Sequence, residues 1–554
     1  YRSTMKLSGD RVLGPSELKH KMGKTIYKTF QATAEYNKTI GGHTFGILAG
    51  YSWEQEDYRY VQGSRDKFPG NDLPYLNAGS PDNQKSEGTG NAWAIQSGFG
   101  RLRYNFNERY LFESTVRYDG SSRFPQSKKF GFFPSVAAGW RLSEENFFKE
   151  NESLGFISNL KLKVSWGRLG NQNIGNYPYQ SVYELGQNYP FGDTYTQGAA
   201  VTTAVDPTIK WEETETIDGG LEAVFWNGLL SVNASYFNRR TYDILYKPSG
   251  SVSTILGQKI SEMNTGELKN FGWEFEVGHR NKIGDVSYNV NANLSIIKNK
   301  LTTLGVGNVE QLNGMVGNGS DLFIGYPIQM YYGYVSDGVF LDENDIKSWY
   351  DQSKVTPNPQ PGDIRYKDIS GPDGVPDGKI DPNYDRVYLG SRIPKFTFGL
   401  NLGVEYKGLD LSVLLQGVAG VTGMLDGFAG WAFRGDGNIQ KWQAEGRFDP
   451  ANPTRYPAYP RLEDLSNSTT PNIVTSDFWT QDASYIRLKN IQLGYTFPKK
   501  MLQAAKISNL RVYVQAENPL CWNKYKPGWD PEINTSGNYY PILATYTFGV
   551  NFKF

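Results

Sequence analysis

The chain has 554 residues, with 57 Lys plus Arg and 57 Asp plus Glu, so its formal net charge is zero. This balance gives no electrostatic reason to expect nucleic-acid binding. The single cysteine, Cys521, excludes an intrachain disulfide, and three separated histidines argue against a His-based metal or catalytic cluster. Aromatic residues make up 14% and all hydrophobic residues only 38%. That composition suits a lipid-facing barrel with aromatic girdles, or a Tyr-rich soluble β protein.

Strict alternation of apolar and polar residues is the dominant pattern along the chain. From Tyr288 to Ile296 every second residue is apolar and the residues between are Asn or Ser, which gives a strand two unlike faces. No run approaches the ~18 apolar residues of a membrane helix, so a membrane-spanning chain of this kind requires a closed barrel. Fifteen strands are predicted, near 25–37, 43–56, 92–106, 109–119, 130–142, 158–170, 211–226, 228–243, 266–281, 284–300, 394–406, 409–420, 484–497, 508–521 and 543–554.

Two local features refine this reading. The alternation changes phase between Leu488 and Ile491, which predicts a β-bulge near Lys489–Asn490. The β-like stretch 331–341 is assigned to loop structure, because an extra strand there would break the strand parity. A short helix is expected near 498–505.

The connections between the predicted strands alternate between short and long. Short turns are typical of the periplasmic side of outer-membrane barrels and long loops of the external side. The largest external loops are 301–393 and 421–483. The odd number of strands is unusual, since bacterial single-chain barrels have an even number. We therefore expect a fragment, in which residues 1–24 end an extracellular loop and residues 25–554 form the C-terminal part of the barrel.

Several motifs resemble the SusC/RagA family of TonB-dependent outer-membrane transporters. They are YDGSSRF at 118–124, WGRLGN at 166–171, GDIRYKD at 362–368, PKFTFGLN at 394–401, ASYIRLKNIQLGYTFP at 483–498 and TYTFGVNFKF at 545–554. The resemblance implies a 22-stranded β-barrel of the Gram-negative outer membrane that imports oligosaccharides or oligopeptides. It also implies a plug, a TonB-contacting segment, a SusD-like surface lipoprotein and a dimer of transporter–lipoprotein pairs. About seven strands and the plug are then expected to be missing or on a separate chain.

The acidic part of loop 301–393 is a candidate calcium site. Closely spaced oxygen ligands with glycines at the turns suit Ca²⁺, whereas a solvated turn is the alternative. The interruption between Pro372 and Pro376 departs from the usual calcium-loop spacing. The candidate ligands are Asp368, Ser370, Asp373, Asp377, Asp381 and Asp385.

Aromatic residues in the long loops form a candidate substrate-binding surface, since aromatic faces stack on sugars and grip peptide side chains. Packing inside the loops is the alternative for each of them. The candidates are Trp349, Tyr350, Phe428, Trp431, Phe433 and Trp529.

No catalytic constellation is expected. Neighbouring carboxylates at 144–145 and 212–215 lie near strand ends and suit an ordinary charged rim. The sequence therefore predicts nutrient import and not an enzyme, with no organic cofactor, and with glycan favoured over peptide. A passive porin and a soluble glycan-active β protein are the alternatives.

Overall fold

The structure is a computed structural model. It describes residues 2–3, 7–8, 11–12, 16–70, 72–247, 255, 257–305, 309–310, 315–318, 321–434, 437–463, 471–503, 506–525, 529–533 and 540–554. No helix among these residues is long and apolar enough to cross a membrane.

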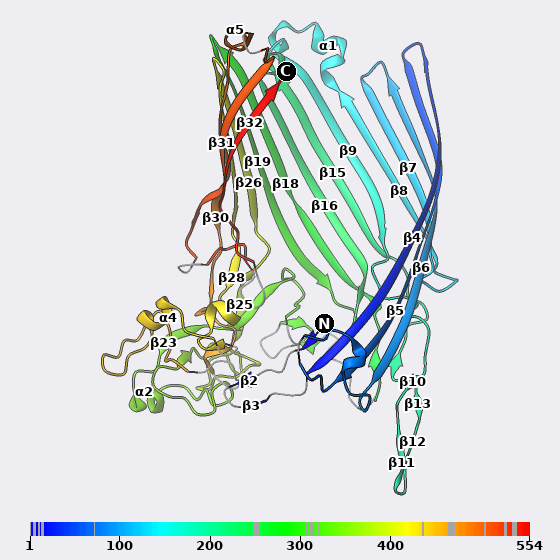
Figure 1. The fold of residues 1–554 in the computed structure, drawn as a ribbon. Helices are drawn as coiled ribbons and strands as arrows, with labels where there is room; N and C mark the ends of the chain where they lie inside the picture. Colours follow the sequence, from blue (N-terminus) through cyan, green and yellow to red (C-terminus); the bar gives the residue numbers. More distant parts are fainter. Residues whose placement is uncertain are drawn as a thin grey trace.

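One large antiparallel sheet dominates the fold (Figure 1). It has sixteen strands, the two-residue β1 (Arg2–Ser3) and fifteen longer ones, each paired with its neighbour along the chain. This confirms the predicted all-β transmembrane-barrel class. The longer strands are β4 (Glu17–Ile40), β5 (His43–Asp66), β6 (Lys85–Phe106), β7 (Tyr110–Ser121), β8 (Phe130–Arg141), β9 (Ile157–Asn171), β15 (Glu212–Phe225), β16 (Leu230–Tyr246), β18 (Met263–Ile283), β19 (Val286–Thr303), β26 (Phe396–Tyr406), β27 (Leu409–Ala419), β30 (Tyr485–Thr496), β31 (Asn509–Asn523) and β32 (Thr545–Lys553).

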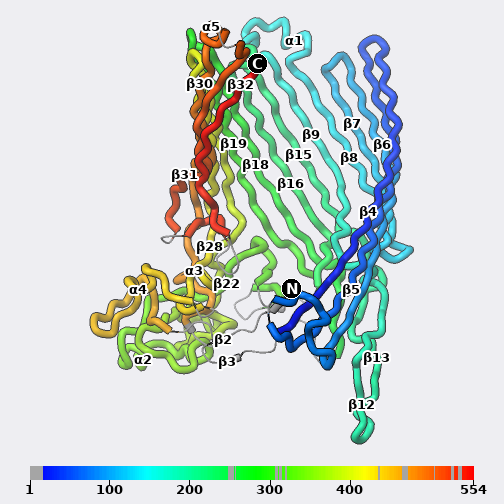
Figure 2. The backbone as a smooth tube through the Cα atoms, in the orientation of Figure 1, coloured from blue at the N-terminus to red at the C-terminus, as the bar shows by residue number. Residues whose placement is uncertain are grey.

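The sheet curls into an open trough (Figure 2). One edge is β32, and the other is β4 with the two-residue β1 paired at its start. Short connections and the small helices α1 (Asn146–Lys149) and α5 (Lys499–Leu502) lie at one end, called here the turn end. Long connections lie at the other, called the loop end. Helix α5 confirms the predicted helix at 498–505, although part of that range, 504–505, lies outside the described residues.

The strand register gives the sheet two chemically different faces. Directly paired residues point to the same side, so Phe275, Leu294 and Phe398 share one face across β18, β19 and β26. Glu276, Asn293 and Gly399 share the other. We call these the outward and inward faces. The inward assignments of Glu274, Glu276, Arg511 and Gln515 follow from the same register.

The outward face is not sealed inside a protein interior. Phe275 is 37% exposed, Trp273 48% and Phe548 72%. The buried hydrophobic clusters lie instead at and beyond the loop end, for example around Phe124 and Trp211. A sheet that leaves its apolar face uncovered and turns its polar face inward is the reverse of a soluble sandwich, and it is the arrangement that lipid requires.

The predicted bulge is confirmed, because the pairing of β30 with β31 shifts register between Leu488 and Asn490. The predicted bounds of the first three strands are too short. Strand β4 begins at Glu17 rather than near 25. The pairing of β5 and β6 continues as far as Ser64 and Lys85, which shortens the connection 57–91 left between the second and third predicted strands. Outward residues in the added part of β5 include Asp57 and Arg59, so the alternation disappears although the pairing continues. A strand that extends past the lipid has water on both sides and needs no apolar face.

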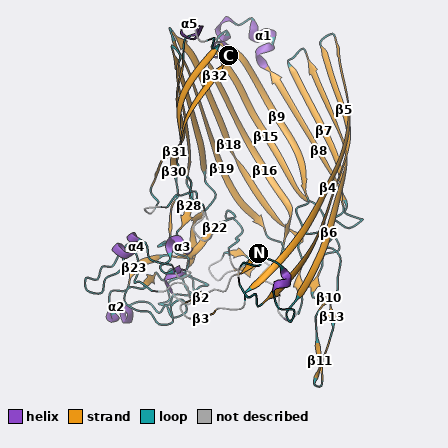
Figure 3. Cartoon of the chain, in the orientation of Figure 1, coloured by secondary structure: helices purple, strands orange, loops and turns teal. Residues whose placement is uncertain are grey.

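The long connections 304–395 and 420–484 fold together at the loop end, and we call their described residues the loop domain (Figure 3). Stretch 331–341 is not a barrel strand, as predicted, but enters two small sheets, β22–β25 and β23–β24. The elements of the loop domain are β20 (Val309–Glu310), β21 (Val316–Gly317), β22 (Met330–Tyr334), β23 (Ser336–Val339), α2 (Glu343–Ser348), β24 (Ile364–Tyr366), β25 (Arg386–Ser391), β28 (Thr422–Met424), α3 (Gly427–Gly430), α4 (Lys441–Gly446) and β29 (Thr480–Asp482).

Shorter strands occupy the remaining loops. They are β2 (Leu7–Ser8), β3 (Arg11–Val12), β10 (Glu184–Leu185), β11 (Tyr189–Phe191), β12 (Thr194–Thr196), β13 (Ala199–Ala200), β14 (Thr203–Ala204) and β17 (Lys259–Ile260).

Candidate functional site

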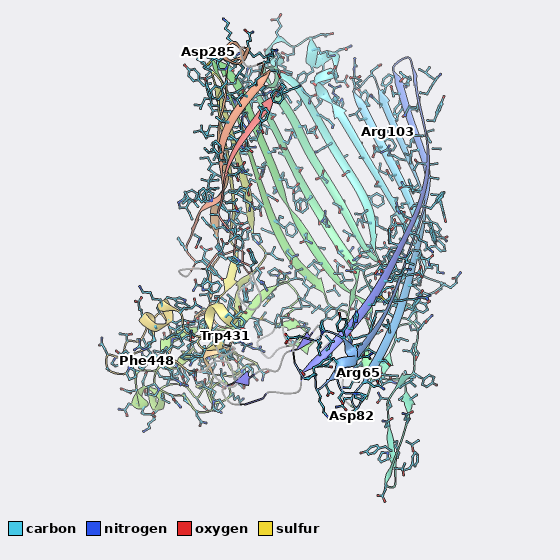
Figure 4. The ribbon with its side chains drawn as sticks, viewed as in Figure 1. Arg65, Asp82, Arg103, Asp285, Trp431 and Phe448 are labelled. Atoms are coloured by element: carbon cyan, nitrogen blue, oxygen red, sulfur yellow. The ribbon has the colours of Figure 1, made fainter. Side chains whose placement is uncertain are left out.

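The inward face carries a ladder of paired charges. Arg103 contacts Glu35 at 2.6 Å, and Lys163 contacts Glu222 at 3.0 Å. On the opposite part of the wall, Arg511 Nε donates to Asp410 at 3.0 Å. A cavity of about 620 Å³ lies against the inward face of β6–β9, and Arg103 is one of the residues that line it. Figure 4 shows Arg103 on the strand wall. These groups make the inner wall hydrophilic, as a water-filled or polar-packed lumen requires.

The loop domain has a core of its own. Tyr366, Tyr459 and Trp479 are each at most 1% exposed, and Phe448 packs with them. Trp431, which packs against this core, and Phe448 both lie in the loop domain, away from the strand wall (Figure 4). A packed aromatic core implies a folded structure and not a loose connection.

Buried ion pairs reinforce this domain. Asp345 pairs with Arg365 at 3.0 Å and also with Arg455. Burial raises the pKa of Asp363, although Arg461 and Asn472 bind its carboxylate and partly offset the effect. A charge held away from water by such partners fixes the geometry of the segments that carry it.

Arg487 connects the barrel wall to the loop after β31. Its side chain, on the inward face of β30, is only 3% exposed and donates to both carboxylate oxygens of Asp530 at 2.7 Å. It also donates to Glu532 at 2.9 Å, and Tyr485 donates to that same carboxylate at 2.6 Å. We call these four residues the Arg487 clamp. Bidentate charged hydrogen bonds are the strong and directional kind, so the clamp fixes this loop over the inner wall.

A cavity of about 380 Å³ lies between the clamp and the loop domain. Its walls include two tyrosines, Tyr331 and Tyr525, a cationic group, Arg392, and an acidic group, Asp426. Burial raises the pKa values of both tyrosines, so they remain neutral hydrogen-bonding groups at physiological pH. Aromatic surface with a few charged groups is the usual lining of a ligand pocket.

The predicted aromatic residues fall into two separate groups. Trp349 and Tyr350 contact each other beside α2, where Trp349 Nε1 donates to the Tyr366 carbonyl at 2.9 Å and Arg365 covers its ring at 3.7 Å. Trp349 is therefore occupied with packing, whereas Tyr350 is 41% exposed.

The second group lies around α3. Trp529 and Trp431 pack against the loop-domain core, and Trp529 Nε1 donates to Gln440 at 3.0 Å. Phe428 and Phe433 are 47% and 37% exposed. The structure thus leaves Tyr350, Phe428 and Phe433 most accessible, and a substrate contact for any of the six residues stays a prediction.

The acidic loop is closed by hydrogen bonds from its own backbone. Asp385, fully buried, accepts from the amides of Ile369, Ser370 and Asp381. Asp368 accepts from Gly378 N at 2.6 Å, and Asp381 pairs with Lys354. In the described part of the chain, no three His, Cys, Asp or Glu side chains are grouped so that they could hold a metal ion.

The remaining candidate ligands do not change this picture. Asp377 accepts from Lys379 N at 3.0 Å, and Asp373 belongs to no metal-binding group of three such side chains among the described residues. Ser370 contributes its backbone amide to Asp385. The calcium site gains no support from this geometry and stays a prediction.

Comparison with known proteins identifies the family. Residues 8–518 match the family described as TonB dependent receptor-like, beta-barrel. The chain belongs to this family. Among curated proteins it is similar to TonB-dependent receptor P3 of Formosa agariphila, with 28% identity over 100% of the chain and 55% of the relative. TonB-dependent receptor SusC of Bacteroides thetaiotaomicron is 28% identical over 97% of the chain and 50% of the relative.

Solved structures agree on the fold. The RagAB peptide importer in its open-open state matches with a TM-score of 0.78 at 24% identity, over 98% of the chain and 56% of that structure's chain. The chain spans about half the length of the curated relatives it matches. The relatives of this TonB-dependent receptor barrel are named as receptors and transporters and not as enzymes.

Sequence reasoning missed the Arg487 clamp of this receptor barrel and the charged residues Arg392 and Asp426 that line the neighbouring cavity. Arg487 lies inside the motif at 483–498, and its charge on the inward face was the available signal. Its partners Asp530 and Glu532 are far away in sequence, and nothing local marks Arg392 or Asp426. Only the folded loops bring these groups together.

Proposed function

We propose that this chain is the pore-forming part of a TonB-dependent outer-membrane importer of the SusC/RagA type, which carries oligosaccharides or oligopeptides. The observation that carries the proposal is the inverted amphipathy of the sheet. The apolar face is outward, the charged ladder is inward, and a folded domain with an aromatic cavity stands at one end. A hydrophilic passage through lipid with a binding surface at its mouth is the basic plan of an importer.

The proposal extends to partners and energy. A SusD-like surface lipoprotein would cover the loop domain, TonB would supply the energy, and two such pairs would associate. The printed names of SusC and of the RagAB peptide importer, together with the family match, support this part. The accessible side chains of Tyr350, Phe428 and Phe433 supply apolar surface for such a partner or for the substrate.

Glycans are the first substrate class to test, because neutral tyrosines and exposed aromatic rings suit stacking on sugars. The gene is deleted, and growth is scored on defined oligosaccharides and on defined oligopeptides as sole nutrients. We expect loss of growth on one class only, restored by the intact gene.

A cavity variant tests the site itself. Tyr525→Ala in the full-length protein should lower uptake of that substrate, whereas Tyr456→Ala, at an exposed position of the loop domain, should not. Uptake that persists without TonB would favour a passive porin. Equal growth of the deletion strain on every substrate would refute import.

A further inference from the structure

Cations occupy the outward face of three neighbouring strands just beyond the apolar band. Arg240 of β16 pairs in register with Lys269 of β18, and Lys269 pairs in register with Lys300 of β19. Lys298 lies two residues from Lys300 on the same face and opposite Phe271. We call these four residues the cation row. Like charges directly opposite one another destabilise a sheet unless an anion lies between them.

Neighbouring carboxylates neutralise only one end of this row. Arg240 contacts Glu267 at 2.7 Å, and Lys269 lies 4.0 Å from the same side chain. Glu215, which pairs in register with Arg240 on its other side, accepts from Trp166 at 2.7 Å. Lys298 and Lys300 are exposed and make no ion pair with any residue that the structure describes. The β19 end of the row therefore keeps two unpaired positive charges.

The position of the row along the strands fixes its depth. On β18 the outward residues that follow Lys269 are Phe271, Trp273, Phe275 and Val277, and the Tyr236 and Trp273 rings lie 5.1 Å apart. Tyr and Trp concentrate where the hydrocarbon meets the headgroups. The cation row lies on the far side of these rings from the apolar band, which is headgroup depth.

The arrangement is asymmetric. Among the described residues of β16, β18 and β19, every Lys or Arg on the outward face belongs to the cation row at the loop end. At the turn end the outward positions are occupied by Leu230, His279 and Tyr288, while Arg280 and Lys282 point inward. Along these three strands, lysine and arginine side chains therefore face only the leaflet at the loop end.

We propose that the cation row binds the phosphate groups of a phosphorylated glycolipid in the leaflet at the loop end. Phosphate is the anion that lipid headgroups carry at this depth. The ammonium groups of two lysines on the same face can both contact it, because each is a compact charge on a flexible side chain. The inference rests on the proposed membrane orientation but not on which substrate is carried or on TonB.

The test uses the full-length protein in phosphatidylcholine nanodiscs doped with lipid A, with bound lipid counted by native mass spectrometry. The variant K298Q/K300Q should bind lipid A about thirtyfold more weakly than wild type, roughly fivefold for each surface cation removed. The control K347Q/K441Q removes the same charge from the loop domain and should bind as wild type. Unchanged heat-modifiable migration of both variants shows that they remain folded.

Two further arms separate the sources of binding. Dephosphorylated lipid A should bind wild type and K298Q/K300Q equally, and inorganic phosphate should not displace lipid A. Equal lipid A binding by wild type and K298Q/K300Q would overturn the proposal, as would a loss shared by the control variant. Displacement of lipid A by inorganic phosphate would show that the row is a general anion site, and it would also overturn the proposal. Uptake assays do not enter any arm, so failure here leaves the import proposal standing.

Discussion

Replacing Arg487 by methionine tests whether the clamp holds the loop after β31 over the inner wall. The guanidinium is 3% exposed, and its partners Asp530 and Glu532 are 19% and 29% exposed at their side chains. Removing one partner of a buried ion pair costs about 3–5 kcal/mol, because the other charge is left without compensation. The variant Arg487→Met should therefore open the loop at least about a hundredfold more often, since 1.4 kcal/mol is a factor of ten.

Hydrogen exchange at the amides of 529–533 in the full-length protein measures this opening directly. The control Arg511→Met removes an ion pair with Asp410 from the same inward wall, at the other end of β31. It should leave exchange at 529–533 unchanged. Equal exchange in wild type and Arg487→Met would refute the clamp, and equal acceleration in both variants would mean that the wall as a whole had loosened.

Four further predictions concern single side chains and the candidate calcium loop. Trp211→Ala should destabilise the loop-end cluster with Phe124 and Phe133 by about 3–5 kcal/mol, visible as a lower chemical-denaturation midpoint; an unchanged midpoint would contradict its burial. Leu294→Arg on the outward face should cost ~2–4 kcal/mol of folding free energy in lipid, whereas Asn293→Arg on the inward face should cost much less; equal costs would contradict the face assignment. Burial raises the pKa of Asp363 above its ordinary value of 3.8. The stability that the protonated form contributes is therefore present below pH 3.8 and is lost as the pH rises through the folded-state pKa. The thermal midpoint of wild type relative to Asp363→Asn should therefore fall over that window, and a constant difference would be inconsistent with the raised pKa. If residues 368–385 bind Ca²⁺, the ion should stabilise the fold in proportion to ln(1 + [Ca²⁺]/Kd) and so raise the thermal midpoint, and Asp368→Asn should abolish this rise. A thermal midpoint that does not change with Ca²⁺ or chelator would contradict the calcium prediction.

The strands were predictable because lipid imposes one rule on every crossing. Between Tyr288 and Ile296 the alternation is complete, and the structure places a strand there with the expected apolar and polar faces. The bulge at Leu488–Asn490 was predictable for the same reason, since a change of phase is visible only against strict alternation. The outer parts of β5 and β6 were missed because Asp57 and Arg59 lie where water reaches both faces and the rule no longer applies.

The loop domain could not be predicted at this level. Its core joins Tyr366 to Trp479 and Tyr459, residues that share no periodic pattern and meet only after long loops close. Trp349, Trp431 and Trp529 attract notice as candidate substrate contacts, but each one packs against the domain. Local sequence shows that an aromatic residue is present and not which of its faces is covered, because the covering residues come from distant segments.

Spin labels placed one at a time along residues 288–298 of the full-length protein in lipid test the inverted amphipathy most directly. The accessibility of each label to dissolved oxygen and to a water-soluble nickel complex is then measured. Even positions from 288 to 296 should be accessible to oxygen and shielded from nickel, and odd positions should show the reverse. Equal accessibility along the strand, or even positions shielded from both reagents, would contradict a sheet whose apolar face meets lipid.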